Sequence, residues 1–274
     1  MEANATMRLT KSVGTAAAAL LLAATASFSQ APTTPAPAKP KSSTASAAKP
    51  AASAATATYD RALLKPALLK EQAPETYQVQ FETTRGDFTI TVTRAWSPLG
   101  ADRFYNLVKH HYFDNARVFR VVPGFVAQFG ISAYPPVTKA WRDAKIKDDS
   151  RSQSNKRGTI VFATSGPNTR TTQLFINFKD NSSLDTMGFT PFGIVDGDGM
   201  NRVEMFYDQY GDTAGMDQEN IETQGEKYLA AKWPKLDTIK RASIIGAAAN
   251  TPAKVTPKPA AKPAPKPTTT TPKQ

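Results

Sequence analysis

An arginine and a glutamine stand among apolar residues in VFRVVPGFVAQFG, residues 118–130, where they could act on a polar group of a ligand. Apolar residues continue on both sides of Pro123-Gly124, which predicts two short strands joined by a turn. Burying an unpaired guanidinium is too costly, so Arg120 either meets a carboxylate at the rim of the fold or lines the mouth of a pocket. This segment alone leaves both interpretations open.

A second informative segment is GTIVFATSGPNTRTTQLFIN, residues 158–177. Its apolar runs, Thr159–Ala163 and Gln173–Ile176, predict strands, and the Ser-Gly-Pro-Asn-Thr sequence between them predicts a turn. The blocks that stand out along both segments are Phe119-Arg120, Gly124-Phe125-Val126-Ala127-Gln128, Gly158-Thr159, Phe162-Ala163, Gly166-Pro167-Asn168-Thr169 and Gln173-Leu174-Phe175-Ile176.

In their order and spacing these blocks resemble the cyclophilins, a family of peptidyl-prolyl cis-trans isomerases. The resemblance runs from about residue 77 to about residue 245 and includes Leu184-Asp185 and Pro191–Val195. It implies a mainly β fold, a closed eight-stranded antiparallel barrel capped by two α-helices, with a packed interior and an outer substrate groove. It also implies an enzyme that accelerates X-Pro isomerisation by non-covalent stabilisation of the twisted amide, so we expect no cofactor and no metal.

The resemblance assigns roles residue by residue. Arg120 matches the family's catalytic arginine, whose planar, permanently charged fork donates to the pyramidal prolyl nitrogen. The substrate-binding residues that it implies are Phe125, Val126, Phe175 and Leu184 in the proline pocket, Gln128 and Gln173 on backbone groups, Ala163 and Thr164 in main-chain contacts, and Phe189 near the position of a pocket histidine.

Three positions depart from the family pattern. Phe119 stands where the family has histidine before the arginine, and Ser183 stands where eukaryotic members often have tryptophan. Phe189 replaces a polar residue by an apolar one. We therefore expect weak cyclosporin binding and an altered substrate preference, with turnover retained.

The remaining elements follow from hydrophobic periodicity and from turn residues. The sequence predicts a hairpin of Tyr77–Phe81 and Phe88–Thr93, a helix from Ser97-Pro98 to near Tyr112, helical segments at residues 201–210 and 218–233, and a closing strand at residues 236–245. Between Gly130 and Gly158 we expect a surface loop with one short strand at most. His110 and His111 have no partners at triad or ligand spacing, which argues against catalytic or metal roles.

The ends of the chain differ from the middle in composition. Residues 1–26 have the basic, apolar and small-residue order of a signal peptide, and residues 27–58 and 251–274 have the composition of disordered linkers, which leaves residues 59–250 as the folded domain. The formal charge of +11 lies mostly in these ends, because residues 59–250 hold 24 basic and 22 acidic side chains. Nucleic acid is therefore not an expected partner. The absence of cysteine excludes disulfides and thiol chemistry.

We expect a periplasmic or secreted monomer that acts on proline-containing segments of folding proteins and is not inserted in the membrane after signal cleavage. Two other functions stay open. A periplasmic holdase or scaffold would bind proline-containing segments with little turnover, and an envelope adhesion protein would bind through its lysine-rich tails. Comparing cis/trans exchange of a short X-Pro peptide with suppression of aggregation of an unfolded client distinguishes the isomerase from the holdase. Deleting the tails should abolish binding by an adhesion protein.

Overall fold

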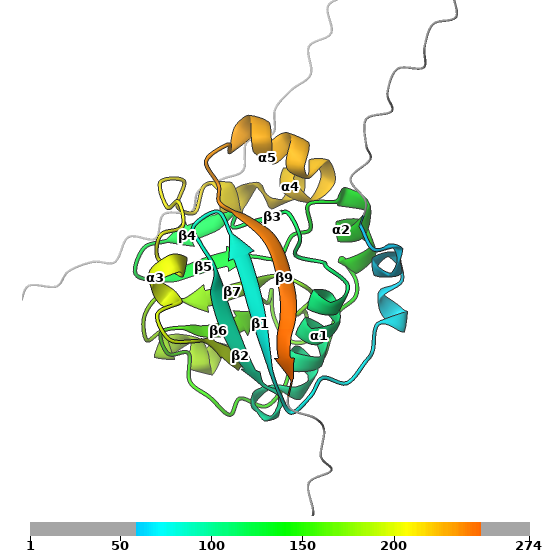
Figure 1. Cartoon of the computed structure of the whole chain (residues 1–274), viewed down its shortest axis with the longest axis vertical. Coiled ribbons are helices and arrows are strands. Elements are labelled where there is room, and N and C mark those ends of the chain that lie inside the picture. The colour runs from blue at the N-terminus through cyan, green and yellow to red at the C-terminus, as the bar shows by residue number, and fades with distance from the viewer. Residues whose placement is uncertain (1–58, 248–274) are drawn as a thin grey trace, which may run out of the picture. The chain divides into compact units, whose positions relative to one another are not determined.

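The computed structural model describes residues 59–247, and the predicted signal peptide, linker and tail lie outside them. Nine strands form one antiparallel sheet that curls around a central core (Figure 1). The strands are β1 (Thr76–Thr83), β2 (Phe88–Thr93), β3 (Ala116–Arg117), β4 (Arg120–Val122), β5 (Val126–Phe129), β6 (Thr159–Phe162), β7 (Leu174–Asn177), β8 (Pro191–Val195) and β9 (Thr238–Ala247).

Helices and 3₁₀ turns connect these strands. The α-helices are α1 (Pro98–Lys109), α2 (Pro135–Trp141), α3 (Met200–Val203), α4 (Gln218–Gln224) and α5 (Glu226–Lys232). The 3₁₀ helices are η1 (Arg61–Leu64), η2 (Pro66–Leu68), η3 (Arg94–Trp96), η4 (Ser182–Met187) and η5 (Ala214–Asp217). Among residues 59–247, no helix has the length and apolarity needed to cross a membrane.

The strand order is β3-β9-β1-β2-β8-β6-β7-β5-β4, and its two end members are neighbours in the chain. Only Val118 and Phe119 separate β3, which pairs with β9, from β4, which pairs with β5. This bent segment therefore links the two edges of the curled sheet. The mainly antiparallel β fold is confirmed, and the ninth strand arises because the bend divides one of the eight expected strands.

The first and last strands of the described chain pair with each other, as the sequence predicted. Val79 lies opposite Ile244 and Phe81 lies opposite Ala242 in the antiparallel register of β1 and β9. Phe81 belongs to the aromatic core, with its ring stacked 5.1 Å from that of Phe88. The interior is filled by side chains, as the family resemblance implied.

The segment between Gly130 and Gly158 differs from the expected surface loop. It contains helix α2, whose Trp141 is buried and donates from Nε1 to the Leu63 carbonyl at 2.8 Å. Pro135 and Pro136 stand at the start of this helix, where missing N–H groups cost nothing. The later helical segments also differ from expectation, because α3 is only one turn and Gly225, at φ 62°, separates α4 from α5.

Helices α4 and α5 lie together at the top of Figure 1 and cover a second apolar cluster. We call residues 207–236, which connect α3 to β9 and contain η5, α4 and α5, the cap. The cluster consists of Phe119, Ile131, Ala214, Ile221, Leu229, Trp233 and Leu236. The cap is therefore seated on Phe119 and Ile131, which flank the strand pair β4–β5.

Candidate functional site

A hollow of about 280 Å³ lies beside the strand pair β4–β5 and brings the predicted site residues together. Its lining residues are Arg120, Phe125, Val126, Gln128, Ala163, Thr164, Phe175, Leu184, Met187 and Phe189. Gln173 lies outside it and lines an adjoining hollow of about 190 Å³, which also contains Gln128, Ala163 and Thr164. The two hollows share these three residues and thus form one continuous groove.

The floor of the larger hollow is apolar. Val126 of β5, Val161 of β6, Phe175 of β7 and Leu184 of η4 form a small buried cluster. Phe189 closes this cluster with its ring edge-on to Phe175 at a centroid distance of 5.5 Å. This shape and chemistry suit a small apolar ring.

A row of polar side chains runs along the groove beside this floor. Arg120 and Gln128 lie directly opposite each other on β4 and β5, and the arginine Nη1 donates to the glutamine Oε1 at 3.2 Å. Gln128 Nε2 in turn donates to Gln173 Oε1 at 2.9 Å, and Gln173 Nε2 donates to Gln218 Oε1 at 2.8 Å. These bonds hold the polar groups in fixed positions along the groove.

Arg120 satisfies both interpretations that the sequence left open. Its Nε donates to Asp212 Oδ1 at 2.5 Å, so the guanidinium meets a carboxylate. It also lines the hollow, with its guanidinium carbon 5.7 Å from the centre of the Phe125 ring. Of the five N–H donors of an arginine, these contacts leave three without a partner among the described residues.

The η4 turn carries Leu184 into the groove and is held by Asp185. The Asp185 carboxylate accepts hydrogen bonds from Ser154 Oγ at 2.6 Å and from the backbone and side-chain nitrogens of Asn155, both at 2.8 Å. Burial raises the pKa of Asp185, but these hydrogen bonds and the nearby Arg151 outweigh burial and leave the pKa below its ordinary value. The ionised carboxylate is therefore the form that anchors the turn.

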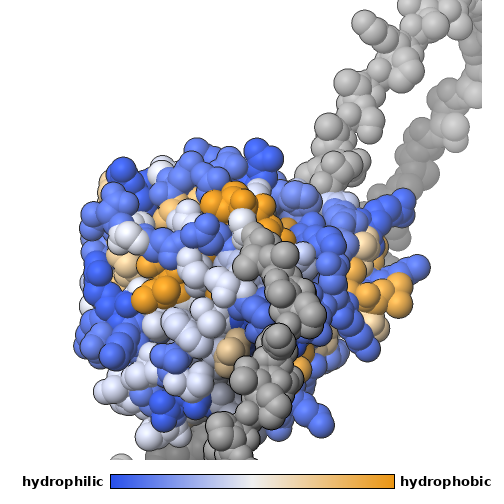
Figure 2. Space-filling model, turned by 60° about the horizontal axis from the view of Figure 1, so that its bottom comes forward, coloured by the Kyte–Doolittle hydropathy of each residue, from blue (hydrophilic) through white to orange (hydrophobic). Residues whose placement is uncertain are grey.

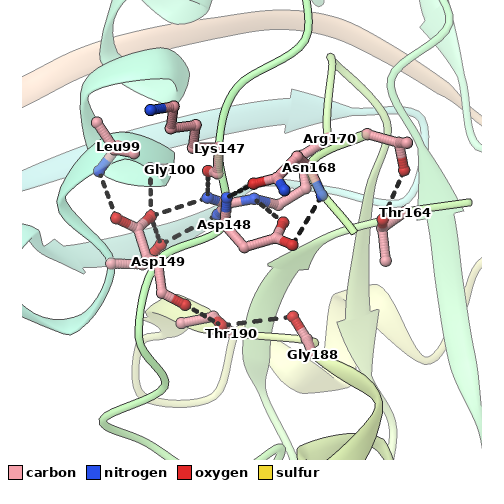
Figure 3. Close-up of polar contacts among 12 residues, drawn as sticks. Leu99, Gly100, Lys147, Asp148, Asp149, Thr164, Asn168, Arg170, Gly188 and Thr190 are labelled. Carbon is pink, nitrogen blue, oxygen red and sulfur yellow. Dashed lines mark hydrogen bonds and ion pairs between the residues drawn. The ribbon is translucent and has the colours of Figure 1, made fainter. Parts of the chain in front are cut away.

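The turn that contains Thr164 forms the opposite wall and is tied to the 142–158 segment (Figure 3). Asp148 and Asn168 exchange two hydrogen bonds, one from each backbone nitrogen to the other side chain, at 2.9 and 2.7 Å. Next to them Arg170 is 2% exposed and pairs with the buried Asp149 at 3.1 Å. The wall is thus fixed by polar contacts that lie outside the groove.

Asp149 also anchors helix α1. Its carboxylate accepts hydrogen bonds from the backbone nitrogens of Leu99 and Gly100 at 3.1 and 3.0 Å (Figure 3). It also accepts one from Ser97 Oγ at 2.5 Å. Ser97 occupies the N-cap position, but its hydroxyl donates to Asp149, whose carboxylate caps the helix in its place. This contact joins the α1 start to the groove wall through Arg170.

Sequence reasoning missed two residues that line the groove, Met187 and Gln218. It also missed two residues that support lining residues from behind or beside them, Val161 in the buried apolar cluster and Asp212 of the cap. Val161 lies in the apolar run Thr159–Ala163, which also contains the predicted groove residue Ala163, so the sequence did carry a signal for Val161. No local signal points to Asp212 or Gln218, because the cap brings them to the groove from a distant part of the chain.

The two histidines do not extend the site. His110 Nδ1 lies 2.6 Å from Asp60 and His111 Nδ1 lies 3.3 Å from Asp114, so both histidines contact carboxylates away from the groove. Within residues 59–247 no three His, Cys, Asp or Glu side chains form a set of metal ligands. The groove therefore offers an apolar pocket, a fixed cation and a row of amides for binding chemistry.

Exposed apolar side chains are few and separate, as the face in Figure 2 illustrates. The most exposed large ones are Met216, Leu68 and Met187. Of these, Met187 lines the groove and is 63% exposed, so it adds an unbranched apolar side chain with several rotatable bonds to the rim.

Comparisons with known proteins match this chain to peptidyl-prolyl cis-trans isomerases. The family model described as cyclophilin type peptidyl-prolyl cis-trans isomerase/CLD matches residues 78–225. A curated peptidyl-prolyl cis-trans isomerase of Acinetobacter baylyi is 31% identical over 179 residues, which cover 63% of this chain and 94% of that protein. A peptidyl-prolyl cis-trans isomerase-like 3 of Rhizopus delemar is 34% identical over 129 residues, covering 43% of this chain and 75% of that protein.

A solved structure is also similar. The crystal structure of a Cryptosporidium parvum cyclophilin type peptidyl-prolyl cis-trans isomerase aligns with a TM-score of 0.46 and 19% sequence identity. The alignment covers 62% of this chain and 98% of that one.

Proposed function

This chain belongs to the cyclophilin-type peptidyl-prolyl cis-trans isomerases. We propose that X-Pro bonds of the substrate isomerise in the groove described above, with Arg120 as the catalytic residue. The observation that carries this proposal is the position of Arg120. It lies at the edge of an apolar pocket, is held by two partners and retains donors for a ligand.

The chemistry follows from the electronic structure of the peptide bond. Rotation about an X-Pro bond faces a barrier of roughly 18–20 kcal/mol, because the planar amide is stabilised by resonance. In the twisted amide the prolyl nitrogen becomes pyramidal and accepts a hydrogen bond. A guanidinium beside that nitrogen therefore binds the twisted form more strongly than the planar form, which lowers the barrier.

The other groove residues position the substrate in this proposal. Phe125, Val126, Phe175, Leu184 and Phe189 hold the pyrrolidine ring in the apolar hollow. Gln128 and Gln173 bind backbone groups, and Ala163 and Thr164 offer main-chain contacts to the residue before proline. Holding the ring while the preceding residue turns confines the motion to the bond that isomerises.

The test is cis/trans exchange of a short Ala-Pro peptide, measured by NMR with the full chain and its variants. Arg120→Ala is expected to lose roughly a hundredfold or more in exchange rate, since it removes a charged donor that acts on the twisted amide. Arg120→Lys keeps the charge without the planar fork and recovers only part of the loss. The matched control is Arg241→Ala, because Arg241 is an exposed arginine of β9 that pairs with Glu82.

A parental exchange rate for Arg120→Ala would remove Arg120 from the catalytic role. Loss of the near-ultraviolet circular dichroism signal would instead make Arg120 a structural residue. Because its side chain is 25% exposed and its partner Asp212 is 52% exposed, we expect the fold to survive.

We propose further that the protein is exported and acts on exported clients as a monomer. The support is the order of basic, apolar and small residues in positions 7–26, which is typical of a cleaved signal peptide. Mass spectrometry of the mature protein should find its first residue just after Ala26. Intact residues 7–26 in a membrane fraction would contradict cleavage.

A further inference from the structure

The cap touches the barrel next to Arg120. Phe119, which precedes the arginine, is 1% exposed and packs in the apolar cluster that seats the cap. This is the position at which Phe119 departs from the polar histidine of the cyclophilin pattern. In this chain the cap covers the position, and the apolar ring packs against it.

From this seat the cap reaches the arginine side chain along its whole length. Asp212 accepts the hydrogen bond of Nε at 2.5 Å. Gly215 lies against the aliphatic stem so closely that a Cβ at this position would be 2.8 Å from the arginine Cδ and 3.0 Å from its Cβ. The cap therefore provides both a carboxylate for the guanidinium and a bare backbone surface for the stem.

The same short segment holds the other end of the polar row. Gln218, which begins α4, accepts the hydrogen bond of Gln173 at 2.8 Å. The row thus runs from Asp212 through Arg120, Gln128 and Gln173 to Gln218, and both terminal members belong to the cap. Displacing the cap would release both ends of the row.

We infer that Asp212 is a positioning residue for Arg120, and that the cap sets the orientation in which the guanidinium meets the twisted amide. This inference rests on the proposed function of Arg120. A guanidinium held only by Gln128 can turn about that bond, whereas a second bond at Nε defines its plane. The Arg120 side chain then loses its conformational entropy when the protein folds, and it does not have to be ordered again in each catalytic cycle.

The alternative role of an acidic partner is competition with the substrate. The geometry argues against it, because Asp212 uses Nε and leaves both N–H groups of Nη2 and one of Nη1 available. Arginine also stays charged beside a carboxylate. Removing Asp212 should therefore lower the rate, whereas removing a competitor would raise it.

The experiment measures kcat and KM for a short Ala-Pro peptide with full-length variants. We expect Asp212→Ala to lower kcat/KM by about tenfold, mostly through kcat, because a misplaced catalytic group costs rate more than binding. Asp212→Glu should restore most of the rate. Asp208→Ala is the matched control, since Asp208 is an acidic residue of the same cap that bonds Gln209 and not Arg120. It should keep the parental values.

Gly215→Ala is an independent perturbation of the same contact. Its added methyl group must displace the arginine stem, so kcat should fall while Asp212 is intact. In the Arg120→Ala background, Asp212→Ala should have no further effect, because a positioning residue acts only through the residue that it positions. Asp212→Asn keeps the size and one acceptor and serves as the second variant if the alanine variant unfolds, with an intermediate rate expected.

Parental or increased kcat/KM in Asp212→Ala overturns the inference. If Arg120→Ala is inactive at the same time, only the role of the cap is wrong. If Arg120→Ala also retains the parental rate, the proposed function of the groove residue itself fails. A loss in Asp212→Ala that persists in the Arg120→Ala background also overturns the inference, because Asp212 would then act on something other than the arginine.

Discussion

Replacing Arg170 by methionine tests how far the groove wall depends on one buried ion pair. The guanidinium pairs with Asp149, pairs at 3.4 Å with the more exposed Asp148 and donates to the Lys147 carbonyl (Figure 3). It also donates to Ser97 Oγ. Methionine fills most of the volume of the arginine stem but makes none of these polar contacts. The variant thus isolates the electrostatic contribution from the loss of packing.

The magnitude follows from burial. Arg170 is 2% exposed and Asp149 is 6% exposed, and breaking a buried pair typically costs about 3–5 kcal/mol because one charge is left uncompensated. Asp149 keeps its hydrogen bonds from Leu99 and Gly100 at the positive end of helix α1, which stabilise an anion. We therefore expect the low end, about 3 kcal/mol, and a Tm lower by roughly 6–12 °C.

Urea unfolding and calorimetry of the full chain measure these quantities. Arg241→Met is the control, because the Arg241–Glu82 pair is exposed and should contribute less than about 1 kcal/mol. Adding Asp149→Asn to Arg170→Met should recover part of the loss, since no uncompensated buried charge remains and Asp148, the other carboxylate beside Arg170, is 34% exposed. A loss below about 1 kcal/mol in Arg170→Met would refute the reasoning from burial.

Two further predictions concern the groove's supports. Folding lowers the pKa of Asp185 from 3.8, so its carboxylate contributes stability above that value, and the contribution is lost as the pH falls through the folded pKa. In urea unfolding, Asp185→Asn should therefore lose less stability than the parent protein as the pH falls below about 5. An unchanged dependence of stability on pH would contradict this. Gly130 has φ 106° and a Cβ there would lie 2.4 Å from the Thr172 carbonyl oxygen, so Gly130→Ala should lower the free energy of unfolding by about 2 kcal/mol or more. Gly124→Ala, with φ 67° and open space around it, is its control and should cost only about 1 kcal/mol by the same urea assay; equal losses would remove the steric argument.

The strands were predictable from local alternation of apolar residues, and the groove residues were predicted from the resemblance of their sequence blocks to the cyclophilins. Alternation in Tyr77–Phe81 requires one buried face, and the blocks around Arg120 and Gln173 each keep their side chains in a fixed register. Every predicted groove residue lines one of the two hollows, although Thr164, Leu184 and Phe189 lie outside the strands. Strand ends shifted by one or two residues, because terminal pairing depends on the neighbouring strand.

The contacts that fix the site's orientation were not predictable in the same way. Asp212 and Arg120 are joined only by the fold of the cap, and no spacing rule relates them. Asp149 was assigned to a surface loop because its charge favours solvent, yet two backbone nitrogens and Arg170 bury it. Gly225 divides α4 from α5 through its non-helical backbone, φ 62°, and a Cβ there would lie 2.8 Å from Pro135 Cδ, a neighbour outside its own helix.

The pairing of β1 with β9 also determines when this domain can become complete. A ribosome delivers β1 first and β9 last, so the edge of β1 stays open while all the intervening residues are synthesised. Closure of so long a loop is slow compared with helix formation, and it needs the whole chain. A transcript that ends before Thr238 would encode an aggregation-prone sheet with an unpaired first strand, not a smaller enzyme.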